Sequence, residues 1–168
     1  LNRAFYGVPI FTNSEGLHTN AVFGFLNIMF KIIDSKQPDY MAVAFDVHQP
    51  TFRHEMFKDY KGTRKPMMEE LREQVPVIKE LLQKMNITTV ELPGYEADDV
   101  IGTLSKKGEK AGMEVDVISG DRDLLQLASD HITICIPKTK KGQTTVEEYN
   151  TEGVRKLYKV TPTEFIDV

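Results

Sequence analysis

Short, continuous apolar runs alternate with segments of helical periodicity, and this alternation constrains the fold most strongly. The run YMAVAF at 40–45 is apolar throughout, which is typical of a parallel strand buried on both faces. Similar runs at 87–92, 114–119 and 132–136 predict three more strands, and 144–149 predicts a fifth at an edge. Because helical segments separate these runs, the pattern predicts an α/β fold with a mainly parallel central sheet flanked by helices.

The intervening segments carry recognisable helix signals. Thr19 is placed to cap a helix that runs to about residue 34. Apolar residues recur at helical spacing over 67–86, where Pro76 should kink or split the helix. A further helix is predicted after the acidic stretch GYEADD, ending near Gly112, and a short one begins at Leu124.

Bulk properties narrow the class of protein. The chain has 168 residues, which suits a single domain over 1–168, and its longest apolar stretch is too short to cross a membrane. Its one cysteine, Cys135, excludes an internal disulfide and is predicted to be a buried, inert thiol. We expect a soluble cytoplasmic protein, monomeric and without a membrane partner.

Six carboxylates follow the predicted parallel strands, and we call them the strand-end carboxylates. They are Asp46, Glu96, Asp98, Asp99, Asp121 and Asp123. Taken singly, each is explained more simply as a helix cap, a first-turn acid or a loop residue. Taken together, they lie beyond three strand ends, at the edge where open α/β sheets hold their ligands.

The chemistry of these six side chains predicts a metal site. Oxygen ligands without a nearby His or Cys pattern favour Mg²⁺ or Mn²⁺, and so many acids predict two ions. Two ions about 4 Å apart are the usual clamp for in-line displacement at a phosphodiester. We assign Asp46, Asp98 and Asp121 to catalysis as well as to metal binding.

Residues 46–66, which we call the basic segment, begin at the first strand-end carboxylate. From 47 to 66 there are five basic and two acidic residues, so the local charge is positive although the whole chain is at −4. Basic side chains interleaved with aromatic ones are typical of contact with single-stranded nucleic acid, and the segment fits a lid or threading element. The predicted DNA-binding residues are Arg53, Lys58, Tyr60, Lys61, Arg64 and Lys65.

The basic segment also has a simpler interpretation. A solvated amphipathic helix would pack its aromatic side chains on the core, and we favour this for Phe52 and Phe57. For Lys61 and Arg64, which flank Gly62 in YKGTR, we favour a functional role.

Six motifs occur here in an order that resembles the 5′–3′ exonuclease domains of bacterial DNA polymerases I, in the flap endonuclease family of PIN-like nucleases. They are TNSEGLHTNAVFGFLN, AVAFD, TFRHE, YKGTRKP, GYEADDVIGTL and SGDRDLLQL. The resemblance implies a PIN-like fold with a basic helical arch, in which the strand-end carboxylates bind metal. Arg53, Lys61 and Arg64 match the arch that clamps the 5′ strand and the scissile phosphate.

The resemblance implies hydrolysis of phosphodiesters near 5′ ends or flap junctions in DNA replication and repair. A metal-activated water attacks in line, and Lys61 or Arg64 stabilises the developing charge as catalytic residues. The implied partners are DNA with a 5′ flap, a nick or a single-stranded 5′ end, an RNA primer, and a covalently linked polymerase domain. The implied location is the bacterial cytoplasm, at the nucleoid.

The resemblance also predicts a domain truncated at both ends. The family's first strand and its later duplex-binding helical region are expected outside the chain, and with them three metal ligands. The alternative is therefore a nucleic-acid-binding module without catalysis. A third hypothesis is a metal-dependent phosphatase on a related scaffold. It expects no basic arch, so the YKGTR segment counts against it.

Overall fold

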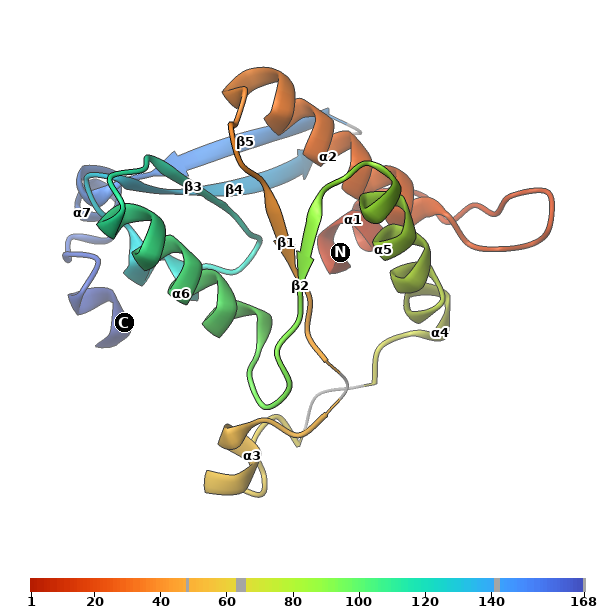
Figure 1. Ribbon diagram of the computed structural model, residues 1–168, viewed down its shortest axis with the longest axis horizontal. Coiled ribbons are helices and arrows are strands. Elements are labelled where there is room, and N and C mark those ends of the chain that lie inside the picture. The colour runs from red at the N-terminus through yellow and green to blue at the C-terminus, as the bar shows by residue number, and fades with distance from the viewer. Residues whose placement is uncertain (48, 63–65, 141–142, 168) are drawn as a thin grey trace. The chain divides into compact units, whose positions relative to one another are not determined.

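The computed structural model describes residues 1–47, 49–62, 66–140 and 143–167 (Figure 1). The chain divides into two compact units, Leu1–Tyr95 and Glu96–Val168, and each is described by itself. The single domain expected over 1–168 stays a prediction. In the described ranges, no helix combines the length and the apolar character needed to cross a membrane.

The first unit packs helices around a short parallel sheet. Its strands pair in register, with Ala42 opposite Thr88. Val22 and Met29 from the second helix meet Phe45, Ile78 and Leu82 in a buried cluster. The elements are α1 (Asn2–Gly7), α2 (Asn20–Lys36), β1 (Ala42–Ala44), α3 (Phe52–Met56), α4 (Glu69–Arg72), α5 (Gln74–Lys84) and β2 (Thr88–Val90).

The break predicted within 67–86 is present, three residues earlier than the proline itself. Glu73 separates α4 from α5, and Pro76 lies in the first turn of α5. A proline is tolerated there because the first N–H groups of a helix have no intrahelical acceptor.

The cap predicted at Thr19 is in the expected place but is made by another residue. Thr19 is the N-cap of α2, yet its side chain makes no capping hydrogen bond. Instead, the buried Gln74 accepts hydrogen bonds through Oε1 from the N–H groups of Ala21 and Val22, at 2.8 and 3.2 Å. An acceptor from α5 therefore satisfies the first turn of α2.

The second unit is built on a three-stranded sheet. Strand β4 pairs in parallel with β3 and antiparallel with β5, so 144–149 forms the predicted edge strand. Cys135 is buried, as predicted. The helix α7 was not predicted. The elements are α6 (Ala97–Lys110), β3 (Val115–Ile118), η1 (Asp123–Leu127), β4 (Ile132–Lys140), β5 (Gln143–Tyr149), α7 (Thr151–Tyr158) and η2 (Glu164–Asp167).

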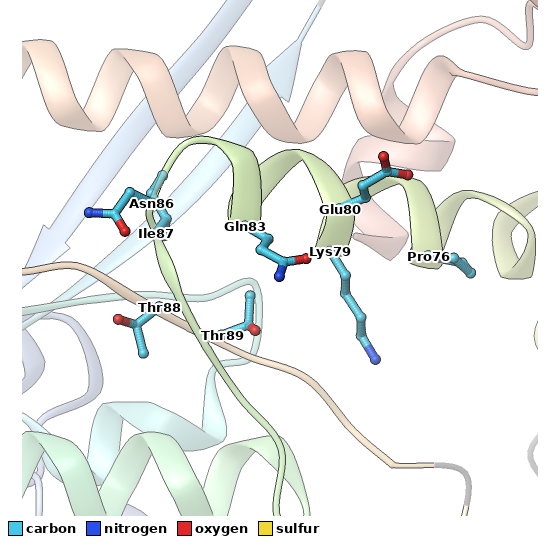
Figure 2. Close-up of a pocket in the computed structure, with 8 residues that line it drawn as sticks. All are labelled: Pro76, Lys79, Glu80, Gln83, Asn86, Ile87, Thr88 and Thr89. Carbon is cyan, nitrogen blue, oxygen red and sulfur yellow. The ribbon is translucent and has the colours of Figure 1, made fainter.

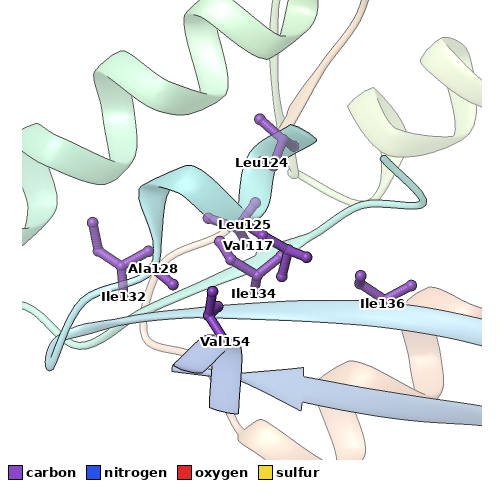
Figure 3. Close-up of a cluster of buried hydrophobic side chains, with 8 residues drawn as sticks. All are labelled: Val117, Leu124, Leu125, Ala128, Ile132, Ile134, Ile136 and Val154. Carbon is purple, nitrogen blue, oxygen red and sulfur yellow. The ribbon is translucent and has the colours of Figure 1, made fainter. Parts of the chain in front are cut away.

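A continuous apolar core joins the elements of the second unit. Figure 3 shows Leu125 of η1 and Val117 of β3 converging on Ile134 of β4, with Val154 of α7 beside them. All four are almost fully buried. Ile101 of α6 packs against the same cluster, so α6 and the segment after β3 are held on one core.

Candidate metal and nucleic-acid site

Asp46 lies just beyond the carboxyl end of β1, as the sequence predicts. The N–H of Phe45 donates to the carbonyl of Val90 at 3.0 Å, which extends the pairing of β1 and β2 by one residue. The buried Phe45 ring anchors the strand end, and Asp46 next to it is exposed. The sheet therefore fixes the backbone from which this carboxylate projects.

The acids of GYEADD form the first turn of α6. Glu96 is the N-cap, and it forms a capping box with Asp99, in which the N–H of Glu96 donates to Asp99 Oδ2 at 3.0 Å. Asp98 lies between them, in the first turn of the helix. The simple interpretation as capping and first-turn acids is thus correct for Glu96 and Asp99. It does not exclude metal binding, because each carboxylate has two oxygens that accept several contacts.

The acids of SGDRD are held by a tight turn after β3. Ser119 Oγ accepts from the N–H of Asp121 at 3.1 Å, and Asp121 Oδ1 accepts from the N–H of Asp123 at 3.0 Å. Both aspartates are exposed. Asp123 opens η1, whose Leu124 and Leu125 are buried in the core that Ile101 of α6 also contacts.

The donor chemistry of the strand-end carboxylates fits a hard divalent cation, since all six offer oxygen. Among the residues with described placement, however, no three His, Cys, Asp or Glu side chains are grouped so that they could hold a metal ion. Asp99 and Asp121 instead accept local backbone N–H groups. The metal assignment of these residues therefore stays a prediction.

The described part of the basic segment places two cations over aromatic rings. Arg53 Cζ lies 4.6 Å from the centroid of the Phe52 ring, and Lys61 Nζ lies 5.1 Å from that of Tyr60. Lys61 has a φ of 57°, in the left-handed region that non-glycine residues rarely adopt. Lys58 is exposed. The predicted residues Arg64 and Lys65 lie outside the described residues.

The aromatic side chains of this segment differ from the prediction. Phe57 is 68% exposed and Phe52 is 38% exposed, so the prediction that they pack on the core was wrong. The helix α3 has only five residues and buries none of them, which gives no apolar face to dock on a core. The Phe52 ring instead contacts the ring of Tyr95, with centroids 5.6 Å apart.

Sequence reasoning missed two residues that contact the predicted site residues or their neighbours. Ser119 fixes the turn that carries Asp121, and the Ser-Gly-Asp sequence was its signal. Tyr95 contacts the basic segment and directly precedes Glu96. The sequence signal for Tyr95 was an aromatic residue between Gly94 and the acids, although no local pattern indicates that it contacts Phe52.

An open groove in the first unit lies apart from the predicted site residues (Figure 2). It runs along α5 and the start of β2, and Lys79 on its wall pairs with Glu91. None of its lining residues is a strand-end carboxylate or belongs to the basic segment. They are Pro76, Lys79, Glu80, Gln83, Asn86, Ile87, Thr88 and Thr89.

Solved structures share this fold. The T5 5′-exonuclease with bound zinc superposes with a TM-score of 0.67 at 21% identity, covering 85% of this chain and 55% of that one. The catalytic core of Rad2 in complex with DNA substrate gives a TM-score of 0.51 at 19% identity, covering 96% and 48%. At these identities the likeness shows the fold alone, which is the predicted PIN-like fold of the 5′ nucleases.

Sequence relatives are much more similar. The DNA polymerases I of Bacillus caldotenax and Bacillus subtilis (strain 168) are each 51% identical over 166 residues, covering 99% of this chain and 19% of the relative. The chain thus spans about a fifth of the length of these relatives. Residues 1–159 match the family described as "5'-3' exonuclease, N-terminal resolvase-like domain". Because this match covers nearly the whole chain, the protein belongs to the family of 5′–3′ exonuclease N-terminal domains.

Proposed function

We propose that the chain is the 5′–3′ exonuclease and flap endonuclease domain of a bacterial DNA polymerase I. The family match over residues 1–159 carries this proposal. The positions of the carboxylates beyond β1, at the start of α6 and beyond β3 support it, because such strand ends are where open α/β sheets bind ligands. The substrates we propose are a 5′ flap, a nick, a single-stranded 5′ end or an RNA primer.

We assign metal binding to the six strand-end carboxylates. Structures of the T5 relative contain divalent metal ions, and the all-oxygen donor set here favours two Mg²⁺ or Mn²⁺ ions. When bound, such ions stabilise negative charge on a phosphate and lower the pKa of a bound water. The carboxylates' own role is to hold that positive charge.

The cations of the basic segment orient the DNA strand. Arg53, Lys58 and Tyr60 bind the backbone and bases near the 5′ end, together with Lys65. Lys61 and Arg64 stabilise the charge that develops on the scissile phosphate. We further propose a monomer linked to a polymerase domain, acting in replication and repair at the nucleoid of a bacterial cell.

The decisive experiment replaces Asp98 or Asp121 by asparagine in the complete natural protein. Cleavage of an end-labelled 5′-flap DNA is measured with Mg²⁺ or Mn²⁺, and with EDTA. We expect kcat to fall by about 100-fold or more, the scale of losing one electrostatic stabiliser. The Asp121→Asn variant keeps a side-chain oxygen that can accept from the N–H of Asp123, so the turn should persist.

A matched control is Asp130→Asn, an aspartate of the same unit just before β4 that lies outside the strand-end carboxylates. It should cut at the unaltered rate. Undiminished cutting by both Asp98→Asn and Asp121→Asn would refute the site assignment.

A second candidate function is DNA binding without catalysis. It is favoured by the lack of a three-ligand group among the described residues. In that case the unaltered protein would bind DNA in a salt-dependent way and would not cut it with any metal.

A further inference from the structure

The base of the basic segment is fastened to the loop that leads into α6. The N–H of Phe52 donates to the carbonyl of Gly94 at 3.0 Å, and the rings of Phe52 and Tyr95 meet at an interplanar angle of 52°. Thr51, which caps α3, is buried and directly precedes Phe52. A backbone hydrogen bond and a ring contact therefore both hold Phe52 against Gly94 and Tyr95.

Arg53 adds a cation to the contact between Phe52 and Tyr95. The guanidinium of Arg53 lies over the Phe52 ring, so Arg53, Phe52 and Tyr95 form a continuous series of contacts, which we call the 52–95 joint. Phe52 and Tyr95 are 38% and 47% exposed, and neither belongs to a buried apolar cluster formed by the described residues of the unit. Burial alone thus does not account for the contact.

The joint lies between two residues that flank predicted site residues along the chain. On one side is Arg53, at the start of the basic segment. On the other is Tyr95, whose carboxyl neighbour is Glu96, the N-cap of α6 and a predicted metal ligand. A shift of Phe52 against Tyr95 would change the separation between Arg53 and the backbone of Glu96, which directly follows Tyr95.

We propose that Phe52 and Tyr95 are positioning residues that set this separation. The inference rests on the proposed function, because it assigns a role within that nuclease site. Reactions that depend on orientation lose rate when groups move by about 1 Å, even where binding is retained. Loosening the joint should therefore lower kcat while leaving KM nearly unchanged, since the cations stay on the chain.

The test is a double-mutant cycle in the complete natural protein. Phe52→Leu, Tyr95→Leu and the double variant are assayed on a 5′-flap DNA at saturating Mg²⁺. We expect each single variant to lower kcat about tenfold with KM changed by less than about twofold. The double variant should be no slower than the slower single variant, because both remove one contact. Tyr95→Phe, which keeps the ring, should restore the rate.

Matched controls are Phe30→Leu and Tyr40→Leu, two exposed aromatic residues of the same unit. They should leave kcat unchanged. Three results would overturn the inference: additive losses in the cycle, a rise in KM at constant kcat as expected of a base-stacking surface, or a lowered melting temperature with normal kcat. If the unaltered protein does not cut the DNA, the proposed function fails as well, and this outcome differs from the three above, in which the unaltered protein still cuts.

Discussion

His131, which directly precedes β4, illustrates how single residues set local electrostatics. Its Nδ1 lies 2.7 Å from Glu114 Oε1. The hydrogen bond to Glu114 raises the pKa of His131 above its ordinary value, and the charges of Glu114, Glu109 and Asp130 add to the effect against an opposing cost of burial. We predict that NMR titration places this pKa above 6.5, and that Glu114→Gln lowers it.

The raised pKa also fixes the sign of the pH dependence. Folding favours the protonated imidazole, so the stabilisation is complete below about pH 6.5 and is lost as pH rises through the folded-state pKa. The change should be small, because the two side chains are 60% and 77% exposed and solvent screens the pair. Glu152→Gln, in α7, is the control. An unchanged His131 titration in Glu114→Gln would refute the assigned cause.

At the scale of elements, α6 contains two glycines whose surroundings differ. A Cβ at Gly102 would lie 3.6 Å from Leu127 Cδ2, an ordinary contact. A Cβ at Gly108 would lie 2.9 Å from Val115 Cγ2, which is too close. Alanine removes backbone entropy from the unfolded chain in both cases, but only the first site accepts the added methyl group.

We therefore predict opposite outcomes for two identical substitutions. Gly102→Ala should raise the free energy of unfolding by about 0.5–1 kcal/mol, or about 2 °C in melting temperature. Gly108→Ala should give no gain or a loss, because Val115 is β-branched and starts β3. Thermal unfolding of both variants measures this. A larger gain at Gly108 than at Gly102 would contradict the packing of α6 against β3.

The elements themselves were largely predictable, and the exceptions have physical reasons. Apolar runs indicated four of the strands, and an edge position was predicted for the polar segment 144–149. The expectation that the run at 40–45 is buried on both faces was wrong, because Ala42 is exposed and Val43 and Ala44 are only half-buried. The cap of α2 was misassigned because its acceptor, Gln74, lies 53 residues from Ala21 in the sequence. Local patterns carry no information about such a partner. The exposure of Phe57 was missed because a five-residue helix has no periodicity to read.

At the scale of the whole molecule, the sequence indicated where the candidate site residues lie along the elements better than it indicated their contacts. The strand-end positions of Asp46 and Asp121 follow from the order of elements alone. The hydrogen bonds of Asp99 and Asp121 with the local backbone, and the contact of Phe52 with Tyr95, depend on loop conformations that composition does not determine. Family membership rests on the match over residues 1–159.

Charge distribution, rather than net charge, decides whether this molecule can bind a polyanion. The whole chain is at −4, but the basic segment is locally positive, and phosphates respond to the nearest charges. Single-stranded binding should weaken with salt in proportion to the number of phosphates neutralised. If all five basic residues of the segment make contact, log K against log salt should have a slope of about −3.5.

Replacing one of these cations should therefore change the slope as well as the affinity. We predict that Lys58→Ala reduces the magnitude of the slope by about 0.7, since one phosphate contact is lost. The measurement is fluorescence anisotropy of a labelled single-stranded oligonucleotide with the complete natural protein in EDTA, over a series of salt concentrations. Lys156→Ala, an exposed lysine of α7, should leave the slope unchanged. Equal slopes for the unaltered protein and Lys58→Ala would remove Lys58 from the DNA interface, whereas an equal reduction in both variants would mean that binding is spread over the surface rather than localised in the basic segment.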